Sequence, residues 1–239
     1  MAQFFDGIGQ FFSGWFNQLY ETFIVDDNWL MLLSGLKNTI IITLGALAIG
    51  FFLGVAISVI KFLAEDKKGL RPIAKVCDFY VTAVRGIPVV VLLLIFYFLI
   101  MRSSEGVIVG IVTFGINSGA YMAEIIRGGI AAVDEGQTEA GRSLGFGRVQ
   151  TMFHIVLPQA IKNILPSIVN EMIALLKETS VAGYVAVQDL TRAANLIRNN
   201  TYDAFNPLII TAVVYLVLVV LMTKALRKLE LRLRVSDAH

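Results

Sequence analysis

Long apolar stretches separated by short polar intervals make up most of the chain. The stretches lie at about residues 30–60, 73–101, 107–126, 160–176 and 204–223. A helix crosses a bilayer with about 17–25 mostly apolar residues, so each stretch is long enough to span a membrane. The pattern therefore predicts an all-α integral membrane protein with five transmembrane helices.

Residues 1–28 have a different pattern. Apolar and aromatic side chains recur at steps of three and four residues, from Phe4 to Phe23, and glycines interrupt them. This spacing favours an amphipathic helix that lies in the membrane interface. A poorly ordered leader is the alternative. Because acidic residues are present and a basic start is missing, a cleavable signal peptide is not evident. We expect residues 29–239 to form a single transmembrane domain.

Composition supports a membrane protein and excludes several chemistries. The chain is 56% hydrophobic, with a mean hydropathy of +0.73, whereas soluble domains average about 45–50% apolar. A net charge of +2 is too small to indicate nucleic-acid binding. The single cysteine, Cys77, excludes an internal disulfide, and two histidines are too few for a convincing metal site.

The basic residues predict the orientation. Fourteen of the twenty Lys and Arg residues fall in three segments: residues 61–75, which we expect to form a loop, residues 127–162, and the tail after residue 223. Five spans put these segments on one side, and positive residues favour the cytoplasm. The N-terminus is then outside and the C-terminus is cytoplasmic. The tail should continue the last span.

Small residues recur every four positions in the first span, at Ala46, Gly50, Gly54 and Ser58. This stripe lets another helix approach closely, although chance in a Gly/Ala-rich segment is the alternative.

A polar interval between two apolar blocks, residues 139–158, contains apolar residues that a free loop would not need, such as Leu144, Phe146 and Phe153. They predict short amphipathic helices that pack on a partner outside the lipid. Gly145 and Gly147 fit a turn between two such helices, and Pro158 can open the next one.

The same interval carries a motif. Glu139-Ala140-Gly141, then Gly145, then Ile155-x-Leu157-Pro158 resembles the EAA motif of ABC importer permeases, with Gly141 in place of the second Ala. Further matches point to permeases for polar amino acids of the histidine/glutamine/arginine type. They are the runs 85–88 (Arg-Gly-Ile-Pro), 119–130, 175–180 (Leu-Leu-Lys-Glu-Thr-Ser) and 190–194.

The resemblance implies a type I importer fold in a bacterial cytoplasmic (inner) membrane and a coupling loop near residues 132–158. It also implies three protein partners: an ABC ATP-binding subunit, an external substrate-binding protein, and a second permease copy or paralogue. The residues placed at the ATPase contact are Glu139, Ala140, Gly141, Ser143, Leu144, Gly145, Ile155, Leu157 and Pro158.

The chain should not hydrolyse ATP itself. A phosphate-binding loop of the GxxxxGK[ST] type needs a Gly-Lys pair, and none of the twenty glycines is followed by Lys. We therefore expect a transport subunit that binds no cofactor, with ATP and Mg²⁺ on the partner.

Polar residues within or beside the spans are candidates for the substrate path, since a buried charge is costly without a reason. They are Arg85, Pro88, Asn117, Tyr121, Glu171, Lys177, Thr179, Ser180 and Gln188. Gly86 and Pro88 can interrupt the second span and free backbone groups toward a cavity. Arg85, which stands beside them, would then hold the carboxylate of an amino-acid substrate.

Alternatives stay open for the charged residues. Arg85 can instead pair with Glu124 or Glu171, and Glu124 can lie near the cytoplasmic interface. Glu171 and Lys177 can line the path or form a structural pair. Residues 177–203 have the pattern of an irregular polar segment, in which the apolar run 181–187 is long enough to dip into the membrane but not to span it. We expect this outer segment to form part of a gate or to contact the binding protein.

Two other functions compete. An ion-driven secondary transporter is disfavoured because no inverted repeat is evident and five is an odd number of spans. A non-transporting scaffold would have no need of the buried charges.

Overall fold

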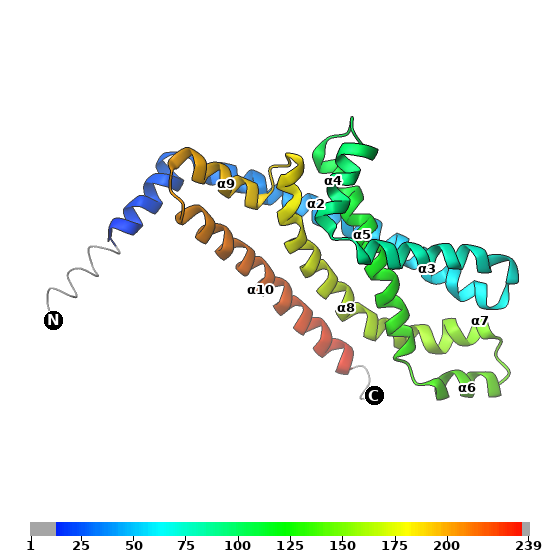
Figure 1. Cartoon of the computed structure of the whole chain (residues 1–239). Coiled ribbons are helices and arrows are strands. Elements are labelled where there is room, and N and C mark those ends of the chain that lie inside the picture. Colours follow the sequence, from blue (N-terminus) through cyan, green and yellow to red (C-terminus); the bar gives the residue numbers. More distant parts are fainter. Residues whose placement is uncertain (1–12, 236–239) are drawn as a thin grey trace.

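The computed structural model describes residues 13–235, and these are helical almost throughout (Figure 1). Residues 13–20 form a helix that continues through a π-helical turn, η1 (Glu21–Val25). The remaining elements are α2 (Asn28–Asp66), η2 (Lys68–Leu70), α3 (Arg71–Gly86), α4 (Val89–Ile95), η3 (Phe96–Ile100), α5 (Gly106–Ala131), α6 (Glu135–Ser143), α7 (Arg148–Thr151), η4 (Met152–Val156), α8 (Leu157–Glu178), η5 (Thr179–Val185), α9 (Leu190–Thr201) and α10 (Asn206–Val235).

Four helical runs are long and apolar enough to cross a membrane: Asn28–Asp66, Gly106–Ala131, Arg148–Val185 and Asn206–Lys228. A fifth crossing is a bent pair, Lys68–Gly86 with Val89–Ile100, whose halves meet at 107°. The all-α fold predicted from hydropathy is confirmed, with five spans when the bent pair counts as one.

The second span differs from the expected continuous helix over residues 73–101. It breaks at Ile87 and Pro88, where α3 ends and Pro88 becomes the N-cap of α4. Proline restricts the preceding residue to extended backbone, and Ile87 has φ −102° and ψ 131°. The interruption inferred from Gly86 and Pro88 is therefore present, and it turns the chain sharply.

Two predicted irregular segments are in fact mostly helical. Residues 61–75 are not a loop, because α2 continues to Asp66 and α3 begins at Arg71. Residues 177–203 contain the end of α8, the 3₁₀ turn η5 and all of α9. The run 181–187 packs in a core cluster with Leu93 of α4 and Phe114 of α5. Tertiary packing and the N-cap of α9 make residues 177–203 helical, although their polar composition alone does not indicate helices.

The centre of the fold is the contact between α2 and α5, the most extensive between any two helices. Gly50 and Gly54 of the predicted small-residue stripe are buried and face Ser118 and Met122. Hydrogen atoms in place of side chains allow the two backbones to approach. The stripe is therefore a packing surface and not a result of composition.

Alanine at Gly54 is expected to destabilise the protein. A Cβ there would lie 2.4 Å from Met122 Cβ, so one helix must shift. Overpacking costs about 1–3 kcal/mol, which outweighs the gain of roughly 1 kcal/mol in helix propensity. Thermal unfolding of Gly54→Ala in detergent should show a lower midpoint than wild type. Gly69→Ala is the matched control, because nothing lies within 4 Å of its added carbon. Equal midpoints would contradict the packing role.

The helices α8 and α10 run side by side across the molecule, and most of their residues are not buried in the chain itself (Figure 1). On α8 the exposed polar residues Asn163, Asn170 and Lys177 recur every seven positions. This spacing keeps them on nearly the same face of a straight helix. A spanning helix thus presents a polar stripe on its outer surface.

Candidate functional site

The segment between α5 and α8, residues 132–158, is called the docking loop here. Asp134 caps α6 by accepting a hydrogen bond from Gly136 N at 2.7 Å. A turn at Gly145, whose φ is +87°, joins α6 to α7, so this glycine occupies backbone space that other residues rarely adopt. The prediction of short helices joined at Gly145 and Gly147 is confirmed.

The two halves of the EAA-like motif meet within this loop. Glu139, Ala140, Gly141 and Ser143 lie on α6, Leu144 and Gly145 form the turn, Ile155 lies in η4, and Leu157 and Pro158 open α8. A Cβ at Gly141 would lie 2.7 Å from Ile155 Cδ1 and 2.8 Å from Thr151 Cγ2. Glycine therefore lets α6 pack closely on η4. Gln159 also donates to Gln137 at 3.1 Å, joining α8 to α6.

Large apolar side chains cover the outside of the docking loop. Leu144 is 76% exposed and Phe153 is 58% exposed, and Phe146 and Val149 are exposed as well. Phe146 stacks on His154, whose Nδ1 lies 2.9 Å from Gln150 O. His154 thus makes a local polar contact within the docking loop. An apolar surface held on a rigid pair of short helices is typical of a site that docks another protein.

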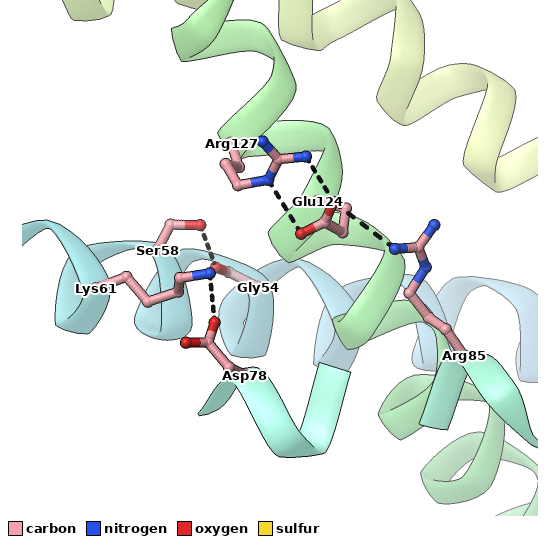
Figure 2. Close-up of polar contacts among 7 residues, drawn as sticks. All are labelled: Gly54, Ser58, Lys61, Asp78, Arg85, Glu124 and Arg127. Carbon is pink, nitrogen blue, oxygen red and sulfur yellow. Dashed lines mark hydrogen bonds and ion pairs between the residues drawn. The ribbon is translucent and has the colours of Figure 1, made fainter. Parts of the chain in front are cut away.

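Charged residues join α2, α3 and α5 (Figure 2). Lys61 Nζ lies 2.6 Å from Asp78 Oδ1, and Glu124 accepts hydrogen bonds from Arg127 at 2.8 and 3.1 Å. Arg85 Nη1 lies 3.6 Å from Glu124 Oε2, and its guanidinium is 5.2 Å from the ring centroid of Tyr121. Of the two acids considered for Arg85, the structure pairs it with Glu124. Arg85 and Tyr121 also line an open pocket of about 640 Å³.

Two carboxylates of α8 face α5. Glu171 accepts a hydrogen bond from Ser118 Oγ at 2.8 Å, and Glu178 accepts one from Asn117 Nδ2 at 3.3 Å. Among the described residues, neither carboxylate forms an ion pair, so Lys177 is not a structural partner of Glu171. Lys177 is exposed. Glu178 and Ser118 were not among the residues predicted to line the path, although Glu178 lies between Lys177 and Thr179, which were.

The candidate residues after α8 lie at the end of the molecule away from the docking loop, and contacts there hold them in place (Figure 1). Thr179 is fully buried, and its hydroxyl donates a hydrogen bond to Leu176 O at 2.7 Å. Ser180 lines a pocket of about 520 Å³ beside α9. The backbone oxygen of Gln188 accepts a hydrogen bond from Asn38 at 3.0 Å. Asp189 caps α9 through Thr191 N and Arg192 N. Burial raises the pKa of the Asp189 carboxyl, and these backbone hydrogen bonds oppose that rise.

The apolar helices and the exposed apolar surface of residues 132–158 define a multi-span membrane protein. Residues 59–235 match the family described as binding-protein-dependent transport system inner membrane component, and the chain belongs to that family. It is therefore a permease subunit of the ABC importer class, located in the inner membrane, and not an enzyme in itself.

Individual relatives cover nearly the whole chain. A putative glutamine transport system permease from Rickettsia bellii is 39% identical over 82% of this chain and 91% of its own length. An arginine transport system permease from Bacillus subtilis is 37% identical over 86% of this chain and 94% of its own. A crystal structure of an amino acid ABC transporter with histidines matches with a TM-score of 0.81 at 39% identity, covering 87% of this chain and 96% of that one.

Proposed function

We propose that this chain forms the translocation path of an ATP-driven importer for a polar amino acid. The observation that carries the proposal is the docking loop, which presents Leu144, Phe146 and Phe153 outside the bundle at the start of a helical run that crosses it. Relatives named for glutamine and arginine transport support the substrate class.

The docking loop would seat on a separate ATP-binding subunit, which holds ATP and Mg²⁺. Leu144 and Phe146 would enter a groove on that subunit, with Glu139 and Gly145 beside them. Closure of the ATPase pair would push the loop and tilt α8, the kind of rigid-body transition that alternates access.

A second permease copy or paralogue would complete the path. The polar stripe of Asn163, Asn170 and Lys177 on α8 is costly against lipid, so we infer that it faces a partner subunit or water. Glu171 and Glu178 lie on the same helix and would attract the ammonium group of the substrate. Arg85, on the rim of its pocket, would attract the carboxylate.

The orientation we propose has the N-terminus outside and the docking loop in the cytoplasm. Figure 1 supports it, because the docking loop, the junction of α2 with α3, and the last turns of α10 before Val235 lie toward one end of the bundle. These are the three basic segments of the sequence. The helix α9 lies toward the other end, where an external binding protein would deliver the substrate.

The N-terminal segment would lie in the outer interface. Of residues 1–28, those before residue 13 fall outside the described part of the chain. In the remainder, Phe16 and Tyr20 are exposed, while Phe23 packs on α9 and Trp15 donates to Asn206 at 2.6 Å. One aromatic face toward the protein and one outward suit an interfacial position.

Co-purification through a C-terminal tag, followed by uptake in liposomes, tests the proposal. We expect an ATP-binding subunit to be retained, and labelled glutamine, arginine or histidine to accumulate only with ATP and the binding protein. Uptake driven by an ion gradient without ATP would favour a secondary transporter. A folded preparation that moves none of these amino acids would favour a scaffold.

A further inference from the structure

One arginine connects the docking loop to α2, a helix that lies far from it in the sequence. Arg148, the first residue of α7, forms ion pairs with two neighbouring acids at the C-terminal end of α2: Glu65, and Asp66 with Nη1 2.7 Å from Oδ1. Its guanidinium also lies 4.5 Å from the ring centroid of Phe62. Phe62, Glu65 and Asp66 share one face of α2, because residues three and four apart are neighbours on a helix.

Open space lies beside this contact. A cavity of about 440 Å³ separates α2 and α5 from the docking loop, with Phe62, Ala123, Thr138 and Met152 among its lining residues. Arg148 also lines it. The long side chain of Arg148 therefore reaches across a gap between the docking loop and α2.

The position of Arg148 determines which movements it can transmit. It begins the helical run Arg148–Val185, which includes Glu171 and Glu178. Movement of the docking loop passes to α8 through this continuous helix. The helix α2 packs on α5 and on α8, and Arg148 adds a direct contact between α2 and the docking loop itself.

We propose that Arg148 is a positioning residue that transmits movement of the docking loop to α2, so that the α2–α5 pair and α8 move together. This inference rests on the proposed function, since it assumes that the loop docks on an ATPase. The planar guanidinium suits the role, because its N–H donors fan out to two carboxylates while its flat face lies on an aromatic ring.

The exposure of these ion pairs to water indicates that they transmit movement of the docking loop and do not stabilise the fold. The Arg148 side chain is 29% exposed, and the acids are 71% and 60% exposed. Ion pairs so open to water contribute little to folding. Loss of Arg148 should therefore leave the subunit inserted and docked while weakening the link between ATP hydrolysis and transport.

The test uses the whole complex, with its ATP-binding subunit and binding protein, in liposomes. The quantity measured is labelled amino acid (arginine or glutamine, as identified by the uptake assay) transported per ATP hydrolysed. We expect Arg148→Gln to lower this ratio at least about fivefold, with normal retention of the ATP-binding subunit. The double variant Glu65→Gln/Asp66→Asn should do the same. Because they act through one contact, the triple variant should be no worse than either.

Lys61→Gln is the matched control, since it removes an ion pair between α2 and α3 that does not involve the docking loop. Its ratio should stay within twofold of wild type. An unchanged ratio in Arg148→Gln, or a triple variant in which the separate losses multiply, would overturn the inference. If Arg148→Gln does not insert, the acid variant alone decides between these outcomes. If the wild-type chain retains no ATPase, the proposed function itself has failed.

Discussion

Leu144→Glu is expected to release the ATP-binding subunit and abolish uptake while the permease still folds. Leu144 is 76% exposed in the isolated chain, so the change removes no internal packing. In the docked complex it would bury an unpaired carboxylate in place of a leucine, whose burial contributes about 1.5–3 kcal/mol. The combined loss corresponds to a fall in affinity of at least about 100-fold. Pull-down through the permease and ATP-dependent uptake both measure it.

Two controls separate docking from general damage. Leu231→Glu introduces the same charge on α10, at a leucine that is 65% exposed and outside the docking loop, and should retain the partner. Leu144→Met preserves the apolar contact and should behave as wild type. Normal partner retention in Leu144→Glu would show that this surface is not the ATPase contact.

The spans were predictable because hydropathy is a local property of the chain. The break in the second span was predictable as well, since Gly86 and Pro88 are local signals. Its angle of 107° was not, because the direction of α4 is set by packing on α5 and on η5, and η5 is distant in sequence. Residues 179–201 were misread for the same reason: their helices depend on burial of Ala182, Val185 and Leu190.

The residues of the candidate site that belong to a sequence motif were predictable. The side-chain contacts between residues far apart in the sequence were not. Motif spacing identified the docking loop and its turn. The partners of Arg148 are 82 and 83 residues away, and those of Glu171 and Glu178 are 53 and 61 residues away. A single sequence contains no signal that matches such pairs. Glu178 had a local signal, because it is the acidic residue of the Leu-Leu-Lys-Glu-Thr-Ser run at 175–180.

Substitution of the carboxylates on α8 is expected to produce the second large effect. It should reduce amino-acid uptake without weakening the binding of the ATP-binding subunit. Glu178→Gln keeps the shape of the side chain and an acceptor for Asn117, so the fold should persist. It removes the negative charge that would hold the ammonium group of the substrate. A hydrogen bond to a charged group contributes about 1.5–3 kcal/mol, so uptake at low substrate concentration should fall roughly 10–100-fold.

The same reasoning applies to Glu171, whose Ser118 contact glutamine can also accept. Because every amino acid carries the ammonium group, uptake of arginine and of glutamine should fall by similar factors if both are substrates. Glu105→Gln, an exposed carboxylate before α5, is the control and should leave uptake unchanged. Retention of the ATP-binding subunit should be equal in all three variants. Full uptake by both Glu171→Gln and Glu178→Gln would remove these residues from the path, and the polar stripe of Asn163, Asn170 and Lys177 would then be the surface to test.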